Sequence, residues 1–469
     1  MAHEAEPWLG IDFGTCRTRA AILIGGELRK VDLAHGAYNR SYDMPTAVYI
    51  RESGEILVGE QALHTRFRDP SRYHHQFKLD IANSRGVTAL VNGVPKRYAW
   101  SELVGAILLH IRLSAEGEYN NGRPFKRAVL TVPAIYTPGG AGTPWSVMEE
   151  AGRMAGFEEV RIEKEPHTVA IFYDYELTNA GHNVGPEGET SLVYDLGGGT
   201  FDPALIRRSG HTFEILRAQS GKGILCGGTF FDQAIREHFS QQCPEIIKNL
   251  KPALRTADGV IQQADALSAA RYERDRIGLE GFLIDLKHRF ADPWVNEVEE
   301  FVPLSSDTVY RLTRAEFDAL LSPMLDETIG CCVDLMRLAG IGWQEISRIL
   351  LVGGSCHLPL VGEKLRASAH AEGAHKTEIC WKRIVGTNRI LDPSFATCMG
   401  ATLAPLVLTP LLKGAGNEAG LSATQSPAST LRTAPVPKPA MPNRTDYRVE
   451  NDPFGVFLRK RGDAEGKVD

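Results

Sequence analysis

Three glycine-rich turns, each directly after a short apolar segment, constrain this chain more than any other feature. They are Gly-Ile-Asp-Phe-Gly-Thr at residues 10–15, Asp-Leu-Gly-Gly-Gly-Thr-Phe-Asp at residues 195–202, and Gly-Gly-Ser at residues 353–355. A backbone can approach a phosphate closely where Cβ atoms are missing, and successive N–H groups in such turns form anion-binding nests. One turn of this kind is typical of an ordinary hairpin loop. Three of them predict a cleft that closes on a phosphorylated ligand from several sides.

An aspartate accompanies each of the first two turns, Asp12 in the first and Asp195 in the second. A carboxylate about 4 Å from a phosphate is repelled by about 4 kcal/mol at an effective dielectric constant near 20, so a cation must lie between them. Mg²⁺ fits this place because it keeps several waters and takes one or two carboxylates together with substrate phosphates. We therefore expect Asp12 and Asp195 to organise a hydrated Mg²⁺.

Further segments occur in an order and at a spacing that are specific for one family. They are residues 128–134 (Ala-Val-Leu-Thr-Val-Pro-Ala), 151–157 (Ala-Gly-Arg-Met-Ala-Gly-Phe), 165–170 (Glu-Pro-His-Thr-Val-Ala), 226–232 (Cys-Gly-Gly-Thr-Phe-Phe-Asp), 392–393 (Asp-Pro) and 399–401 (Met-Gly-Ala). From about Leu9 to Leu403 the chain resembles the nucleotide-binding domain of the 70-kDa heat-shock chaperone (DnaK-type) family, within the actin-like ATPase superfamily. The resemblance implies an α/β, two-lobed actin-like ATPase fold of the duplicated ribonuclease H type, with ATP or ADP and Mg²⁺ as cofactors.

The resemblance also implies catalytic roles. Lys78 would position the attacking water, Glu165 would share that water and the metal shell, and Thr200 would contact the terminal phosphate. Asp12 and Asp195 would hold the hydrated metal, with Asp195 also counted as catalytic. Such a set is coherent because phosphoryl transfer needs positioning and charge neutralisation more than covalent help. For Lys78 the alternative is a solvated surface lysine, and for Glu165 it is a turn residue before a proline.

A larger set would surround the nucleotide. The 197–199 turn would cradle the β- and γ-phosphates, the third turn would lie under the ribose and adenine, and Lys287 would reach the nucleoside from the other lobe. The implied cofactor-binding residues are Gly14, Thr15, Cys16, Gly197, Gly198, Gly199, Gly227, Gly228, Lys287, Gly353, Gly354, Ser355 and His357.

Several positions depart from the family pattern. Cys16 stands where a second threonine is usual, and His357 stands where an arginine stacks on adenine. Histidine keeps a flat face but loses the permanent, bidentate charge of arginine. Ala291 and His288 replace a serine and an arginine, and residues 136–145 replace a helix start that carries a relay arginine. These departures predict an altered nucleotide affinity and leave open the coupling to a client module.

Composition excludes other classes of function. The 469 residues are 43% hydrophobic and 23% charged, which is ordinary for a globular protein, and the formal net charge is −6. That charge, without a basic stripe, argues against a nucleic-acid partner. No apolar run reaches the roughly 20 residues that span a bilayer, and the first residues lack the basic and apolar regions of a signal peptide. We expect a cytoplasmic protein without a nucleic-acid or membrane partner.

The eight cysteines form no Cys-x-x-Cys pair and no zinc-finger spacing with histidine. Their pattern favours a reducing compartment. Cys16 and Cys356 fall inside the predicted nucleotide loops, where oxidation could block ATP binding. The favoured alternative is that both are small apolar fillers.

Apolar alternation predicts strands at residues 8–13, 19–24, 127–132, 192–195, 201–207 and 348–352, and apolar residues at helical spacing predict helices at 101–113, 149–156, 230–239, part of 261–289, 317–338 and 395–403. Residues 9–24 and 192–207 share one strand–Asp-Gly-Thr–strand pattern, which predicts an internal duplication. Lobe I would be residues 7–190, closed by 385–405, and lobe II would be residues 191–384. The lobes would face each other across the nucleotide and move as a hinge.

The composition changes after Leu403. Residues 406–412 form an apolar patch that resembles the interdomain linker of the chaperone family, and the alternative is the end of the closing helix or a strand packed on the body. Residues 413–446 are rich in Ala, Pro, Ser, Thr and Gly, so we expect a disordered C-terminal tail. The apolar residues 454–458 are either a docking motif or part of that tail. A peptide-binding β-sandwich with its lid needs more residues than follow 412, so we expect no client-binding domain.

Two functions fit these observations. The first is a stand-alone chaperone-like ATPase that hydrolyses ATP slowly with Mg²⁺ and acts on or with a separate partner protein, which residues 406–469 could contact. The second is a nucleotide-sensing scaffold that switches its lobe angle with little or no turnover. A filament-forming protein and a sugar kinase share the fold, but no further carboxylate is assigned to a sugar hydroxyl. We favour the ATPase.

Overall fold

The computed structural model describes residues 7–34, 41–81, 86–181, 185–210, 212–218, 226–250, 266–380, 391–414, 447–452 and 455–460. Two large mixed sheets dominate these residues. The first has the order β11-β10-β1-β2-β3, with β4 paired to β2. Its strands are β1 (Leu9–Phe13), β2 (Arg17–Ile24), β3 (Glu27–Lys30), β4 (Asp43–Pro45), β10 (Arg127–Val132) and β11 (Glu159–Lys164).

The second sheet has the order β14-β13-β12-β17-β18. Its strands are β12 (Thr190–Asp195), β13 (Ala204–Ser209), β14 (Thr212–Ala218), β17 (Ile346–Val352) and β18 (Glu378–Cys380). In both sheets the first three strands along the chain pair antiparallel, and the first of these, β1 or β12, pairs in parallel with a later strand, β10 or β17. The last strand of each sheet along the chain, β11 or β18, extends the parallel part. The predicted internal duplication is confirmed for five strands of each sheet, and β4 has no counterpart among the described strands of the second sheet.

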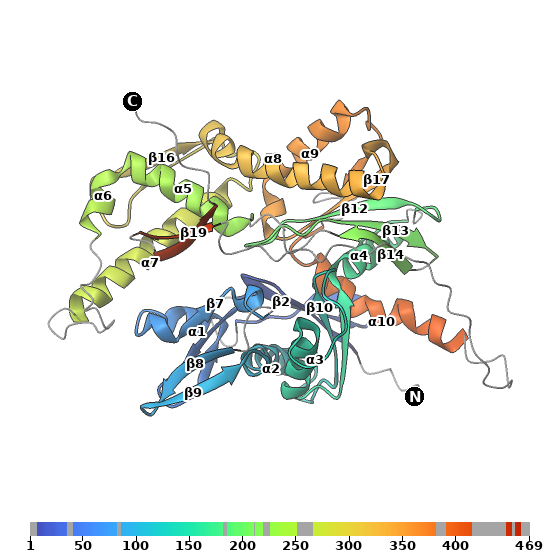
Figure 1. The fold of residues 1–469 in the computed structure, drawn as a ribbon, viewed down its shortest axis with the longest axis horizontal. Helices are drawn as coiled ribbons and strands as arrows, with labels where there is room; N and C mark the ends of the chain where they lie inside the picture. The colour runs from blue at the N-terminus through green and yellow to red at the C-terminus, as the bar shows by residue number, and fades with distance from the viewer. Residues whose placement is uncertain are drawn as a thin grey trace.

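Helices cover the two sheets, and Figure 1 shows α2 and α3 with the first sheet in the lower half and α8 and α9 with the second sheet in the upper half. The helices are α1 (Gly59–Thr65), α2 (Trp100–Tyr119), α3 (Pro144–Met154), α4 (Glu165–Asn179), α5 (Gly228–Gln242), α6 (Pro244–Asn249), α7 (Ala266–Arg289), α8 (Arg314–Ala339), α9 (Pro359–Ala371) and α10 (Ala396–Gly414). Short sheets complete the fold: β5 (Ala47–Ile50) with β6 (Ile56–Val58) and β7 (Tyr73–His75), β8 (Gly86–Val91) with β9 (Val94–Ala99), β15 (Glu297–Phe301) with β16 (Val309–Thr313), and β19 (Tyr447–Asp452) with β20 (Gly455–Lys460).

Each predicted strand and helix has a counterpart; β10 has the predicted ends, and the others are shifted at one or both ends. Residues 261–265 of one predicted helix and residues 415–446 of the predicted disordered tail lie outside the described residues. Residues 406–412 continue α10, which decides between the alternatives that the sequence left open for this patch. Residues 447–452 and 455–460 form the hairpin β19–β20, while residue 454 of the predicted docking motif lies outside the described part. The lobe boundaries stay predictions.

Helices α4 and α10 lie between the two sheets (Figure 1). Side chains of α4 such as Val169 pack with Val193 and Leu350 of the second sheet. Helix α10 packs on the first sheet, where Thr402 Oγ1 donates to the Ala21 carbonyl at 2.9 Å. The two helices thus join the half of the molecule built on the first sheet to the half built on the second sheet. Helix α4 carries Glu165 at its first turn.

Gly400→Ala should strongly destabilise the protein. An added Cβ would lie 1.7 Å from the Thr168 carbonyl oxygen and 2.4 Å from its carbon, and a helix backbone cannot rotate out of the way. Because α10 and α4 must then separate, we expect a loss of about 3 kcal/mol or more in the free energy of unfolding, measured with denaturant. Gly117→Ala is the matched helical control, since nothing lies within 4 Å of its Cβ position. Similar losses in both variants would contradict this explanation.

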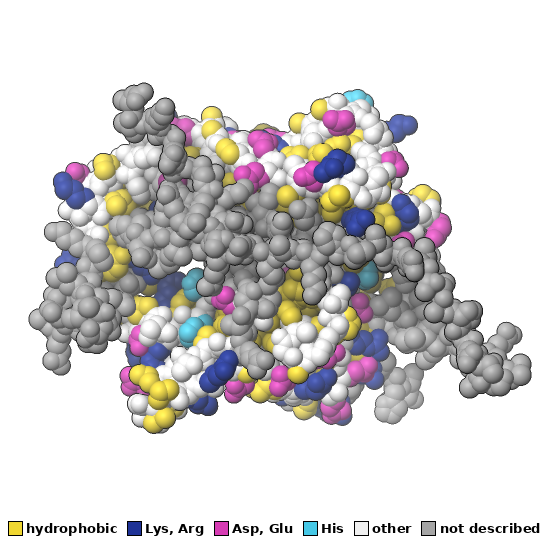
Figure 2. Space-filling model, in the orientation of Figure 1, with side chains coloured by type: hydrophobic (Ala, Val, Ile, Leu, Met, Phe, Trp, Pro, Cys, Tyr) yellow, Lys and Arg dark blue, Asp and Glu magenta, His cyan; other side chains and the backbone are white. Residues whose placement is uncertain are grey.

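The described surface carries charges of both signs. On the face shown in Figure 2, acidic and basic side chains are interspersed over both halves of the molecule. Mixed charge of this kind gives little long-range attraction for a polyanion. Among the described helices, none combines the length and the apolar character that crossing a membrane requires.

Candidate functional site

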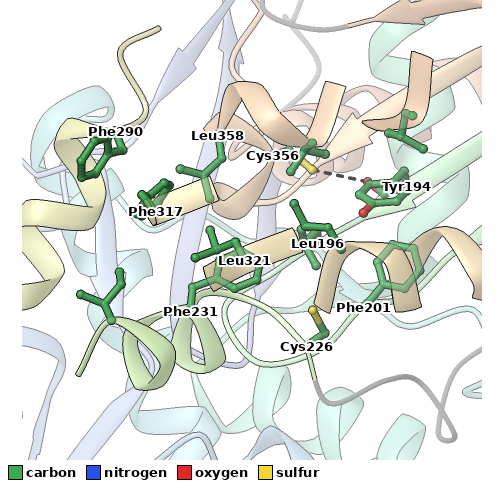
Figure 3. Close-up of a cluster of buried hydrophobic side chains, with 14 of the residues drawn as sticks. Tyr194, Leu196, Phe201, Cys226, Phe231, Phe290, Phe317, Leu321, Cys356 and Leu358 are labelled. Atoms are coloured by element: carbon green, nitrogen blue, oxygen red, sulfur yellow. Dashed lines mark hydrogen bonds between the residues drawn. The ribbon is translucent and has the colours of Figure 1, made fainter. Parts of the chain in front are cut away.

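Asp12 and Asp195 occupy equivalent places near the ends of β1 and β12. Their neighbours in sequence are core residues: Phe13 is fully buried, and Tyr194 and Leu196 point into the hydrophobic cluster of Figure 3. Successive side chains of a strand face opposite sides. The two carboxylates are therefore turned away from the cores of their own halves.

Lys78 and Glu165 form a nearly buried ion pair in the first half of the molecule. Lys78 Nζ donates to Glu165 Oε1 at 2.9 Å, and the two side chains are 12% and 9% exposed. Burial alone would lower the pKa of Lys78, but the carboxylates of Glu165 and Asp12 raise it above its ordinary value. The alternative of a solvated surface lysine is therefore wrong. Glu165 is the nearly buried partner of Lys78 and not only a turn residue before a proline.

Four carboxylates share the space around this lysine. Burial raises the pKa of Asp12 despite the opposing charge of Lys78. Burial also raises the pKa of Glu165 to about 7, and the carboxylates of Asp12 and Asp202 add to the effect. The pKa of Asp195 lies well above its ordinary value, first through burial and then through Glu165, Asp202 and Asp12. Lys78 opposes these shifts and Arg19 opposes the one at Asp12, so the four carboxylates outnumber the cations that act on them.

This charge imbalance fits a hydrated divalent cation. Within the described residues, no group of three or more His, Cys, Asp or Glu side chains is arranged to hold a metal ion by itself. Mg²⁺ does not need such a group, because waters and substrate phosphates supply most of its ligands and one or two carboxylates suffice. Crowded carboxylates with raised pKa values are what a cation at this place would relieve. That Asp12 and Asp195 hold this cation stays a prediction.

The second glycine turn is wedged between two other glycines. Gly227 has φ +145° and Gly353 has φ +90°. A Cβ on Gly227 would lie 2.6 Å from the Gly197 carbonyl oxygen, and one on Gly353 would lie 2.3 Å from the Leu196 carbonyl oxygen. Ser355 Oγ also donates to the Gly197 carbonyl at 2.8 Å. Backbone thus packs on backbone, which only residues without a Cβ allow.

The first turn meets the second turn from the opposite half of the molecule. A Cβ on Gly198 would lie 2.5 Å from Cys16 Sγ, and one on Gly199 would lie 3.3 Å from Thr15 Cγ2. The three turns therefore approach one another, as the sequence predicts, and the 197–199 turn is at their centre.

Lys287 reaches this region from α7, whose Leu283 and Leu286 pack in the same core as Leu196 and Cys356. Lys287 therefore comes from the half that carries the second and third turns, and the prediction that it comes from the other lobe is wrong. Its Nζ lies 2.6 Å from Asp232 Oδ1 and donates to the Gly228 carbonyl at 3.2 Å. Burial raises the pKa of the Cys16 thiol to about 11, although Lys287 opposes the shift. Burial likewise raises the pKa of Cys356, which is fully buried. Both cysteines stay protonated at neutral pH and are weak nucleophiles, which favours their interpretation as fillers.

The remaining predicted residues lie on the turns themselves. The Thr200 carbonyl accepts a hydrogen bond from Gly197 N at 3.1 Å, and the Gly14 carbonyl accepts one from Thr46 Oγ1 at 2.8 Å. A Cβ on Gly354 would lie 3.9 Å from an Arg19 guanidinium nitrogen.

His357 is held by the segment that leads into α10. Its Nε2 lies 3.0 Å from Ser394 Oγ and 3.3 Å from Asp392 Oδ1, and Asp392 Oδ2 accepts from Lys30 Nζ at 2.6 Å. Although burial alone would raise the pKa of Asp392, hydrogen bonds from His357 and Lys30 hold it below its ordinary value. This network links the third turn to β3 of the first sheet, and stacking of His357 on adenine stays a prediction.

Asp202 is a site residue that the sequence analysis did not assign. Its backbone N–H donates to the Asp195 carbonyl at 2.9 Å, and Leu196 pairs with Phe201 in an isolated bridge. A hairpin closes around the 197–199 turn and sets Asp202 opposite Asp195. The available signal was the second aspartate of the motif at residues 195–202, because a tight hairpin brings both of its ends together.

The pH dependence of stability should differ between the wild-type protein and Glu165→Gln. Burial raises the pKa of Glu165 from 4.5 to about 7 in the folded state. The folded carboxyl therefore holds a proton that the unfolded one has released, so its contribution to stability is full below pH 4.5 and is lost as the pH rises to 7. Glutamine does not titrate.

The free energy of unfolding of Glu165→Gln should therefore rise relative to that of the wild type across this window, by at most about 1.4 kcal/mol per pH unit. Denaturant unfolding of both unliganded proteins at several pH values measures the difference. A constant difference between them would contradict the raised pKa.

Comparisons with known proteins agree with this geometry. Residues 8–377 match the family described as Hsp70 protein. The chain is also similar to the chaperone protein DnaK of Methanothermobacter thermautotrophicus, with 28% identity over 358 residues, which cover 76% of this chain and 55% of the relative. It thus spans about half the length of this curated relative. Because the family match includes β1, β12, β17 and all three glycine turns, the chain belongs to the Hsp70 protein family.

Proposed function

We propose that this protein binds ATP and ADP with Mg²⁺ between its two halves and hydrolyses ATP slowly, as a chaperone-like ATPase module. The Lys78–Glu165 pair carries this proposal, because it lies in one charged cluster with Asp12 and Asp195. The three glycine turns approach one another next to those carboxylates. Nucleotide-dependent motion between the halves would act on, or with, a partner protein.

The residues divide the work of hydrolysis. Backbone amides of the 197–199 turn would donate to phosphate oxygens, and Thr15 and Thr200 would add hydroxyl donors. Lys78 would hold the attacking water, and Glu165 would accept its proton, because a pKa of about 7 suits a base at neutral pH. Bound Mg²⁺, held by Asp12 and Asp195, would neutralise and orient the phosphates.

Two measurements on the pure protein test this function. Calorimetry should detect heat for ATP and ADP in the presence of Mg²⁺, and a chelator should weaken the binding. Radiolabelled ATP should release phosphate slowly, and Asp195→Ala should remove that activity. The proposal fails if no adenine nucleotide binds to the magnesium-loaded protein.

A nucleotide-sensing scaffold with little or no turnover is the second candidate. The contacts of His357 favour it, because this side chain ties the third turn to the segment before α10. A nucleotide that moved the third turn would then act directly on the junction between the halves. This candidate predicts nucleotide-dependent thermal stabilisation without hydrolysis above the level of Asp195→Ala. A pull-down with residues 406–469 would test whether that region contacts the partner protein.

A further inference from the structure

The turn after β10 leaves the first sheet between two of the site carboxylates. Strand β10 lies between β1 and β11 and runs parallel to both, with Ile11 opposite Leu130 and Val132 opposite Lys164. Parallel strands end at the same edge of a sheet. Asp12 is at that edge on β1, and Glu165 directly follows β11. Whatever follows β10 therefore emerges between these two side chains.

Tyr136 is the residue that closes this turn. Its backbone N–H donates to the Pro133 carbonyl at 3.0 Å, and its ring packs against the core of the first half. The side chain is half-buried. The charged groups within electrostatic reach of the phenol are Lys78, Asp202 and Glu165. They come from both halves of the molecule, so Tyr136 stands where the halves meet.

The phenol differs chemically from these charged neighbours. Burial raises the pKa of Tyr136 above its ordinary value of 10. The hydroxyl therefore keeps its proton at neutral pH, where it is an uncharged group that can both donate and accept hydrogen bonds. A hydroxyl that donates to one of the neighbouring carboxylates still has lone pairs with which to accept a hydrogen bond from a water.

We propose that Tyr136 is a positioning residue of the hydrolytic site. Its hydroxyl donates to a carboxylate of the cluster and accepts a hydrogen bond from the attacking water, which fixes that water beside Lys78 and Glu165. This inference rests on the proposed ATPase function and deepens it. The hydroxyl does not contact the base or the ribose in this role, so it acts on the rate of hydrolysis and leaves the binding of nucleotide unchanged.

Tyr136→Phe tests this role. The variant keeps the ring and removes the hydroxyl, so kcat and the single-turnover rate should fall about tenfold, the effect of one lost hydrogen bond, while KM and the calorimetric affinity for ATP stay within about twofold. Tyr175→Phe is the matched control, because the Tyr175 hydroxyl donates to the Gly26 carbonyl at 3.2 Å on an exposed part of the same half. The control should change neither value.

The possible results separate the two proposals. If the wild-type protein binds ATP but releases no phosphate, the ATPase function fails and the role of Tyr136 fails with it. If the wild type hydrolyses ATP and Tyr136→Phe does so at the same rate, the inference about Tyr136 alone is overturned. A rise in KM together with a lower melting temperature and an unchanged kcat would show that Tyr136 only packs against the core.

Discussion

Lys78→Ala should lower the rate of ATP hydrolysis by about two to three orders of magnitude and leave the binding of ATP largely intact. Burial raises the pKa values of Asp12, Glu165 and Asp195, and the positive charge of Lys78 lowers them. The Lys78 Nζ is 2.9 Å from Glu165 Oε1. Its removal takes a positioned donor from the reacting water, and the loss of one such donor typically has an effect of about this size. The phosphate-binding amides remain. Radiolabelled ATP turnover measures the rate, and calorimetry measures the binding.

The stability of Lys78→Ala is a second readout. Removal of one partner of a buried ion pair costs about 3–5 kcal/mol when the other charge stays uncompensated. Here Glu165 has a pKa of about 7 even with its partner present, so it can take up a proton and reduce that cost. Lys248→Ala, which breaks an exposed pair with Glu245 on α6, is the matched control and should alter neither turnover nor stability. Full turnover by Lys78→Ala would refute the assigned role.

The duplicated hairpins could be predicted because they are local. In residues 9–24 and 192–207 the strand, the aspartate, the glycine turn and the returning strand follow one another directly in sequence. The pairing of β1 with β10 and of β12 with β17 joins segments more than a hundred residues apart, as in Leu9 with Ala128. Local patterns do not specify such partners, so the duplicated pattern predicted two similar lobes but not how the distant strands pair within each sheet.

The site residues also divide into those that a local sequence pattern predicts and those that it does not. Glycine turns can be recognised in the sequence, because a close approach of one backbone to another excludes a Cβ. The Lys78–Glu165 pair could be assigned only through the resemblance, since nothing near either residue reveals the other. The network of His357, Asp392 and Lys30 was not predicted, because it exists only when α10 docks between the two halves. Asp202 lies within the motif, but it belongs to the site only because the hairpin brings it back to Asp195.

Gly227→Ala should weaken the binding of ATP at least about tenfold. An alanine here combines a strained backbone at φ +145° with a Cβ that would lie 2.6 Å from the Gly197 carbonyl oxygen and 3.1 Å from Gly199 N. These are backbone atoms of the turn assigned to the β- and γ-phosphates, so the turn itself must move. Nest amides act only when they converge on the anion, and a displaced turn loses that convergence.

The matched control is Gly210→Ala, at φ +60° with nothing within 4 Å of its Cβ position. It also places an alanine at a positive φ, at a cost of about 1–2 kcal/mol, but its Cβ touches nothing. If backbone strain alone mattered, both variants would lose stability and keep their affinity for ATP. If the 197–199 turn binds phosphate, only Gly227→Ala loses affinity, and calorimetry with Mg²⁺ and ATP detects the difference. Equal affinities for ATP in the two variants would show that the 197–199 turn does not bind phosphate. The proposed nucleotide site would then be refuted.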